Sequence, residues 1–215
     1  MRCFLVVVTL CFLGWSCKQK KRYHDQKQGT VLNTSVQIEA ILQFQKEKVA
    51  EFKNPETSPL PDRYRKNFQG LDFFPPEEEY IINAYLKRTP EAKPFKMATS
   101  TDRESYEVVY GIATFQLNGV DHELEVYRGL DMITTPGFEN RLFLPFLDLT
   151  NGEETYGGGR YLDLRIPDGD TLVIDFNRAY NPYCVYNKKY SCPLVPRQNF
   201  MNTRVLAGEK QFSVK

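Results

Sequence analysis

EVVYGIATFQLNGVDHELEVY, residues 107–127, holds two strand-like runs that flank Asn118-Gly119. Both central positions of a tight type I′ turn need a positive φ, and Asn followed by Gly tolerates this better than other residue pairs. The stretch therefore predicts an antiparallel hairpin of residues 107–117 and 120–127, and it points to β-structure as the main element of the fold.

Further strands are predicted on both sides of this hairpin. Residues 79–87 alternate with a period of two, which is the pattern of a strand. Residues 142–147, 161–166 and 171–176 also read as strands, with turn residues between them. Short strands separated by turns predict a mainly β (α+β) fold, in which an antiparallel sheet forms a sandwich or a partly closed barrel.

An amphipathic helix is predicted before the strands, over residues 34–53. Thr34 and Gln37 have the spacing of a capping box, and Asn54-Pro55 ends the helix. Its apolar residues recur at helical spacing, so we expect it to pack across the sheet, and a partner-binding role is the alternative. Residues 34–215 are then one domain, with the helix at 34–53 and a β-rich part at 70–215.

The amino terminus has the pattern of an export signal. Residues 1–16 begin with Met1-Arg2 and continue in an apolar run that is shorter than the ~20 residues of a membrane span. The run stops before Cys17, which resembles a bacterial lipoprotein signal, although Trp15 is bulkier than the residue usual there. We expect a signal peptide at 1–16 and a flexible tether at 17–33 carrying a lipid on Cys17; an ordinary secretory signal is the alternative.

This pattern predicts a location and a partner. A lipid on Cys17 would hold the protein on a membrane of the cell envelope, facing the periplasm or the cell surface. The chain has 28 Lys and Arg against 27 Asp and Glu, so no basic excess indicates nucleic-acid binding. Its 15 Phe, 13 Tyr and 41% hydrophobic residues predict a well-packed core and not a disordered chain.

Residues 143–208 hold the densest set of polar and glycine-rich motifs. Five short segments in and just after this part resemble the signature of the bacterial and archaeal DUF1684 family: Phe146–Gly152, Thr155–Leu162 (TYGGGRYL), Asp175–Cys184, Ser191–Leu194 and Ala207–Lys210. The resemblance extends from about residue 69 to the end of the chain. It implies no reaction, because the family is named for its lack of an assigned function.

The same part of the chain supplies the candidate ligand-binding residues. Hydroxyl, amide and aromatic groups together suit a small polar ligand, and they suit a self-satisfied network of loop residues equally well. We expect a polar cleft where residues 155–160 meet residues 175–192, in a binding or structural module. The candidate binding residues are Tyr156, Gly158, Arg160, Asp175, Asn177, Tyr180 and Asn181.

The alternative to a binding module is a hydrolase. Asp148 or Asp175 would act as the catalytic carboxylate, and Arg160 would clamp an anionic group of the substrate. The glycines at 157–159 lack the Lys-Ser/Thr and the helix of a P-loop, so they favour a bulge or a bend against another backbone. A third possibility is an envelope protein whose surface only docks a partner.

Two cysteines, Cys184 and Cys192, remain once the amino-terminal segment and Cys17 are set aside. They fit a disulfide in an oxidising compartment, a pair of plain thiols, or a metal or catalytic site. A metal site with these cysteines, His122 and one carboxylate would lack any standard ligand spacing. We therefore predict no metal and no cofactor, and the redox state of the two cysteines stays open.

Overall fold

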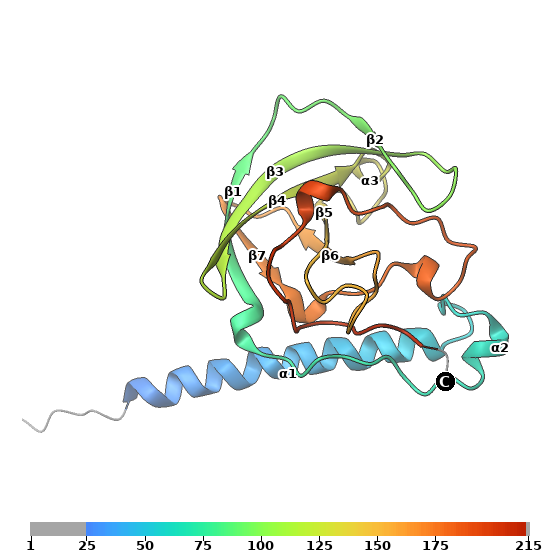
Figure 1. Ribbon diagram of the computed structural model, residues 1–215. Coiled ribbons are helices and arrows are strands. Elements are labelled where there is room, and N and C mark those ends of the chain that lie inside the picture. Colours follow the sequence, from blue (N-terminus) through green and yellow to red (C-terminus); the bar gives the residue numbers. More distant parts are fainter. Residues whose placement is uncertain (1–24, 214–215) are drawn as a thin grey trace, which may run out of the picture.

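The computed structural model describes residues 25–213, and its main element is one curled antiparallel sheet that forms a half-barrel (Figure 1). The strands are hydrogen-bonded in the order β6-β5-β4-β3-β1-β7, and β2 pairs with β3. The predicted mainly β, antiparallel class is confirmed. The strands are β1 (Ile81–Arg88), β2 (Phe95–Met97), β3 (Ser105–Leu117), β4 (Val120–Gly129), β5 (Arg141–Phe146), β6 (Arg160–Arg165) and β7 (Thr171–Asp175).

The helices are few, and all but the first are short. They are α1 (Asp25–Lys53), α2 (Asp62–Arg65) and α3 (Leu130–Ile133), with 3-10 turns η1 (Glu78–Tyr80), η2 (Phe176–Arg178), η3 (Tyr183–Val185) and η4 (Arg197–Asn199). The predicted signal peptide, the lipidation at Cys17 and the first part of the tether lie outside the described residues. Within residues 25–213, no helix has the length and apolar character needed to span a membrane.

The hairpin that the sequence predicts at Asn118-Gly119 is present. β3 and β4 pair from Leu117 and Val120 onward, and the two turn residues have φ angles of 54° and 75°. Positive φ at both central positions is the type I′ geometry, whose twist matches that of the strands. This hairpin forms the centre of the sheet, and β1 and β5 join it on either side.

One face of the sheet carries the hydrophobic core. Successive side chains of a strand point to opposite faces, so alternate residues of each strand enter the core. The core face of the two central strands includes Ala113, Phe115, Leu124 and Val126, all buried. β5 and β6 add Leu142, Leu144, Phe146, Leu162 and Leu164 to the same cluster.

A β-bulge in β3 changes which face its first residues occupy. The register shifts between Val109, which lies opposite Tyr127, and Gly111, which lies opposite Val126. Tyr127 and Val126 are neighbours on β4 and so face opposite sides of the sheet. The extra residue therefore turns Glu107 and the start of β3 away from the core face.

Helix α1 begins at Asp25 and not at the predicted Thr34, so residues 25–33 of the predicted tether are helical. The helix runs along one end of the curled sheet (Figure 1) and contacts η1 and η2. Near its end, Phe52 is 1% exposed and packs edge-on to Tyr186, with ring centroids 4.7 Å apart. Phe52, Leu60 and Tyr186 form a second hydrophobic cluster, smaller than the core of the sheet, which joins α1 to the carboxy-terminal part of the domain.

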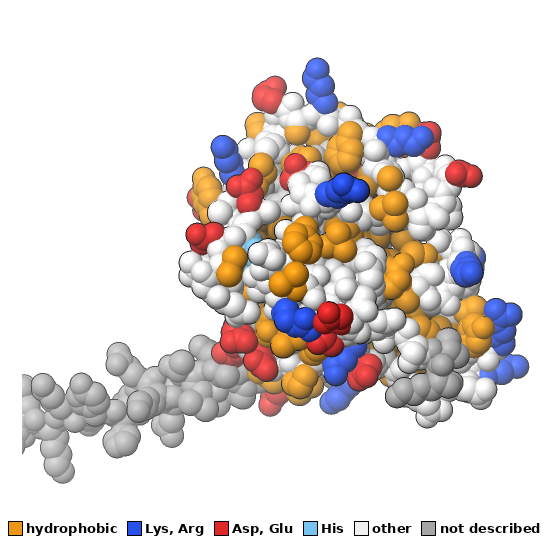
Figure 2. Space-filling view, in the orientation of Figure 1, with side chains coloured by type: hydrophobic (Ala, Val, Ile, Leu, Met, Phe, Trp, Pro, Cys, Tyr) orange, Lys and Arg blue, Asp and Glu red, His pale blue; other side chains and the backbone are white. Residues whose placement is uncertain are grey.

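The visible surface carries side chains of both charge signs. Figure 2 shows acidic and basic groups spread over the same face, with apolar side chains between them.

Candidate functional site

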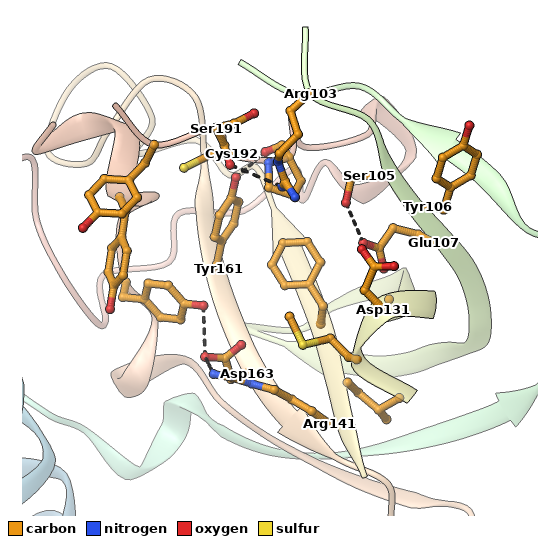
Figure 3. Close-up of a pocket in the computed structure, with 18 of the residues that line it drawn as sticks. Arg103, Ser105, Tyr106, Glu107, Asp131, Arg141, Tyr161, Asp163, Ser191 and Cys192 are labelled. Atoms are coloured by element: carbon orange, nitrogen blue, oxygen red, sulfur yellow. Dashed lines mark hydrogen bonds and ion pairs between the residues drawn. The ribbon is translucent and has the colours of Figure 1, made fainter. Parts of the chain in front are cut away.

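A pocket of about 400 Å³ lies over β3 to β6, on the face of the sheet opposite the core. Segment 180–193 and helix α3 form its other walls (Figure 3). Its rings, charged groups and small polar groups come from both halves of the domain. The lining includes Lys48, Arg103, Ser105, Glu107, Asp131, Arg141, Phe143, Tyr161, Asp163, Tyr180, Tyr183, Tyr190, Ser191 and Cys192.

Glu107 is the buried charged group of this pocket. Its side chain comes from the part of β3 before the bulge, and the residue is 7% exposed. Oε1 accepts a hydrogen bond from Ser105 Oγ at 3.0 Å, whereas Oε2 is buried and has no partner. Burial, and then the nearby Asp131 charge, raise the pKa of Glu107, while Ser105 and Arg103 act in the opposite direction.

Strand β6 divides its residues between the core and the pocket. Arg160, Leu162 and Leu164 face the core, and Tyr161 and Asp163 face the pocket. The Tyr161 ring packs edge-on to Phe143, which lies on the same face, with centroids 4.8 Å apart.

Asp163 is held by two neighbours at the lower edge of the pocket in Figure 3. It pairs with Arg141 of β5, and it accepts a hydrogen bond from Tyr180 Oη at 3.0 Å. Burial of Tyr180 and the adjacent Asp163 charge both raise the pKa of the Tyr180 phenol. At neutral pH this phenol stays protonated and acts as a donor.

Helix α1 also reaches the pocket. Lys48 Nζ lies 5.4 Å from the centre of the Tyr180 ring and 5.9 Å from that of Tyr183, and it pairs with Glu51 at 3.0 Å. Tyr183 donates a hydrogen bond to Glu51 Oε1 at 2.8 Å. The aromatic wall of the pocket is thus fixed to the amino-terminal helix.

The candidate Arg160 lies in the core and not in the pocket. Its side chain is 0% exposed, and Nη2 contacts Asp148 Oδ2 at 2.9 Å and the carbonyl of Val205 at 2.9 Å. Nη1 donates to the carbonyl of Ala207. The guanidinium thus binds protein acceptors and holds residues 205–207 against β6.

Asp148 serves the same buried network. Its Oδ1 accepts hydrogen bonds from the backbone N–H of Thr150 at 2.8 Å and from that of Val205 at 3.2 Å. Asp175 instead caps η2, where it accepts from Asn177 N at 3.1 Å and pairs with Arg178 at 3.0 Å. Neither carboxylate lines the pocket, and the hydrolase that uses them stays a prediction.

Of the seven candidate ligand-binding residues, Tyr180 lines the pocket. Asn177 bonds to the backbone of Glu77, with its Nδ2 2.9 Å from the carbonyl oxygen. Asn181 Nδ2 donates to the Lys210 carbonyl at 2.8 Å, and its N–H donates to Glu209 Oε2 at 3.1 Å. These amides connect segments far apart in the sequence.

The glycine-rich turn before β6 is also positioned by packing. A Cβ at Gly158 would lie 2.5 Å from the Tyr156 ring, so these two candidates contact each other. Gly159 has a φ of +88°, and a Cβ there would lie 2.6 Å from the carbonyl oxygen of Phe146. The close approach of two backbones explains glycine at position 159.

Cys184 and Cys192 are neighbours, and both are free thiols in the structure. The backbone N–H of Cys184 points to Cys192 Sγ at 3.2 Å, and Cys192 lines the pocket. Burial raises the pKa of the Cys192 thiol to about 11, so it is not an activated nucleophile. The disulfide stays a prediction, one that the adjacency of the residues allows.

No cluster of three or more His, Cys, Asp or Glu side chains suited to a metal ion occurs in the described part of the chain. His122 is buried beside Phe115, with ring centroids 5.6 Å apart, and it does not line the pocket.

Sequence reasoning missed Glu107, Ser105 and Asp131. One signal in the sequence could have identified Glu107. If β3 alternated strictly, Glu107 would lie on the same face as Ala113 and Phe115, which is the apolar face of the sheet and a costly place for a charge. A bulge resolves this conflict. Asp131 lies in α3 and carries no comparable signal, because the tertiary fold alone places it beside the pocket.

Comparison with known proteins fits the fold and the motifs of the second half. Residues 66–210 match the model of the family described as "Protein of unknown function (DUF1684)". The chain belongs to the DUF1684 family. Apart from Lys48, all the pocket residues named above lie within the DUF1684 region.

A solved structure supports the same assignment. The DUF1684 protein described here is 32% identical to an uncharacterized protein from Haloarcula marismortui, whose solution NMR structure matches it with a TM-score of 0.62. The match covers 86% of this chain and 96% of that one. The archaeal protein therefore shares this fold over nearly its full length.

A curated plant protein also matches part of the sequence. It is named primary amine oxidase 2, from Arabidopsis thaliana, and it is 27% identical over 158 residues. The match takes in 66% of this chain, which spans 23% of the length of that protein.

Proposed function

We propose that this DUF1684 protein is a binding module that takes a small polar ligand in the pocket beside Glu107. The observation that carries the proposal is a pocket of about 400 Å³ lined both by aromatic rings and by a buried carboxylate with an unpartnered oxygen. Small-molecule sites usually have volumes of about 300–1,000 Å³ and combine apolar walls with a few placed polar groups.

The construction of the pocket supports a role in binding. Glu107, Phe143 and Tyr161 project from paired strands, so the sheet fixes their positions before a ligand arrives. Tyr180 is held by Asp163 and Tyr183 by Glu51. A site built in advance loses little conformational entropy when it binds.

An NMR titration of the full chain tests this proposal. Small aromatic fragments that carry an amine, a hydroxyl or a carboxylate are added one at a time, and amide shifts are followed by residue. We expect saturable shifts to cluster on β3, β4 and segment 180–193. A second hollow, lined by Tyr64, Phe68 and Phe212, is the internal control. Shifts there only, or scattered without saturation, would contradict the proposal.

We further propose that the module is attached to a membrane of the cell envelope through a lipid on Cys17. The sequence supports this because an apolar segment directly precedes that cysteine. In a bacterial host, the unaltered chain should be found in the membrane fraction, and Cys17→Ser should move it to the soluble fraction. Membrane association that survives Cys17→Ser would exclude the lipid anchor.

A further inference from the structure

We propose that the ligand carries a positively charged nitrogen and that this group binds the Glu107 carboxylate. The inference rests on the proposed function, because it assigns the chemical class of the ligand in the same pocket. Three features support it: the Glu107 oxygen without a partner, the absence of a side chain at the facing Gly129, and the charges around the carboxylate.

The Glu107 carboxylate is incomplete as the protein folds it. Only Oε1 has a hydrogen bond, from Ser105 Oγ, while Oε2 is buried without a donor. A buried carboxylate oxygen without a donor is costly to maintain. Among the described residues that line the pocket, Glu107 Oε2 is the one buried side-chain oxygen or nitrogen in this state. A ligand that brings N–H donors and a positive charge satisfies the missing interaction.

The residue opposite Glu107 is a glycine, which places no side chain against the carboxylate. Gly129 of β4 pairs with Glu107, and a Cβ at Gly129 would lie 3.3 Å from Oε2 and 3.5 Å from Oε1. Any larger residue would crowd the carboxylate. The glycine thus avoids this crowding, and the neighbour that packs at the same place is Met132 of α3, whose Cγ would lie 3.3 Å from that Cβ.

The charges of the pocket favour a cation at this position. The Asp131 carboxylate lies beside that of Glu107 (Figure 3), and its charge acts on Glu107. The cations Arg141 and Lys48 are already paired, with Asp163 and Glu51 respectively. Two neighbouring carboxylates attract a positive group and repel a negative one.

Arg103 is the cation that could compete for this position. It is exposed, and its Nη2 donates to the carbonyl of Ser191 at 3.4 Å, across the pocket mouth. Its charge reaches Glu107, but it makes no hydrogen bond to that carboxylate. Arg103 therefore leaves the direct contact with Oε2 open to a ligand.

The aromatic residues suit the rest of such a ligand. Phe143, Tyr161, Tyr180, Tyr183 and Tyr190 line the same pocket. Ring faces attract cations, and ring edges and faces pack on apolar groups. The arrangement fits an organic amine with an apolar or aromatic body better than it fits a bare metal ion.

Three probes of similar shape and different charge test the inference: phenethylamine, phenethyl alcohol and phenylacetate. Dissociation constants are measured by NMR titration of the full chain. A charged hydrogen bond in a buried site adds enough free energy for phenethylamine to bind about tenfold or more tightly than the alcohol. We expect phenylacetate to bind more weakly than either.

Matched variants locate the effect. In Glu107→Gln, the affinity for phenethylamine should fall about tenfold while that for the alcohol changes little. Glu123→Gln, at an exposed position of β4 that does not line the pocket, is the control and should change neither affinity. Asp131→Asn, at an exposed position, should weaken phenethylamine binding to a smaller degree. If Glu107→Gln does not fold, this variant still tests whether negative charge in the pocket favours the amine.

The outcomes separate this inference from the proposed function. The proposal of a cationic ligand is wrong if the alcohol or phenylacetate binds the pocket as tightly as the amine. It is also wrong if the amine still binds more tightly than the alcohol in Glu107→Gln. In both cases the proposed binding pocket is unaffected. If none of the three probes shifts the pocket residues, the pocket itself is not a binding site, and both proposals fall together.

Discussion

At the scale of single residues, the described structure separates buried ionic groups that hold the fold from one that faces a pocket. Arg160 and Asp148 satisfy each other and several backbone groups. Glu209 is 2% exposed and accepts hydrogen bonds from Tyr186 Oη and from Asn181 N. Glu107 differs from these because it lines the pocket, where its Oε2 has no hydrogen-bond partner.

Replacing Arg160 should destabilise the fold strongly. Arg160→Met leaves the Asp148 carboxylate buried without its charge partner, which costs about 3–5 kcal/mol of unfolding free energy. Urea unfolding measures the change. Arg178→Met, whose side chain is 45% exposed and pairs with Asp175, is the control and should cost about 1 kcal/mol or less. Equal losses in the two variants would contradict a structural role specific to Arg160.

Glu209 should make the protein less stable as the pH rises. Burial raises the pKa of this carboxyl from its usual 4.5 to about 7, so the folded state holds a proton that the unfolded state releases between those values. Its contribution is complete below pH 4.5 and is lost as the pH rises through about 7, a change of the order of 3 kcal/mol.

Urea unfolding at several pH values between 4.5 and 8 measures this loss. Glu209→Gln should remove most of the decrease in unfolding free energy with pH, because the amide does not titrate. The remaining slope should be small, because the raised pKa of Glu107 makes the protein less stable as the pH rises and the lowered pKa of the buried His122 does the opposite. An unchanged slope in Glu209→Gln would show that other groups cause it.

At the scale of elements, two local features position the residues of the pocket: the bulge in β3 and the glycine-rich turn before β6. The sequence predicts the hairpin and most strands, because turn residues and period-two patterns are local signals. The bulge was not predicted, since it depends on how β3 and β4 pair. Arg160, a residue of the predicted cleft, faces the core, whereas its neighbour Tyr161, which was not a candidate, faces the pocket because successive residues of β6 point to opposite sides.

The glycines before β6 should differ sharply in their tolerance of a side chain. Gly159→Ala forces a strained φ and a contact with the Phe146 carbonyl, and should cost about 2 kcal/mol or more. Gly157→Ala places its methyl group 3.7 Å from Gly152 and should stay within about 0.5 kcal/mol of the unaltered protein. Thermal unfolding distinguishes them, and similar midpoints would refute the close approach at Gly159.

At the scale of the whole molecule, helix α1 and the half-barrel form one structure. The helix predicted over residues 34–53 is present and ends at Lys53 as predicted, but it begins at Asp25. The capping pattern at Thr34 did not mark its start, because such residues can also occur inside a long helix. Phe52 packs against Tyr186, and Glu51 binds Tyr183 of the pocket wall. No local pattern in the sequence predicts these contacts between residues more than a hundred positions apart.

Removing the Phe52 ring should destabilise the whole domain. Phe52→Ala deletes a fully buried ring and should cost about 3–5 kcal/mol, with a single unfolding transition seen by both circular dichroism and tyrosine fluorescence. Leu42→Ala on the same helix, 39% exposed, should cost far less. Two separate transitions in Phe52→Ala would show that the helix and the half-barrel unfold independently.

The alternation along β6 has a consequence for how this protein can change over time. Arg160, Leu162 and Leu164 are buried in the core, whereas Tyr161 and Asp163, in between, line the pocket that we propose binds a ligand. Substitutions that alter ligand preference and substitutions that threaten the fold therefore fall on different positions of one short strand. Descendants of a common ancestor can diverge in specificity while inheriting the same interior.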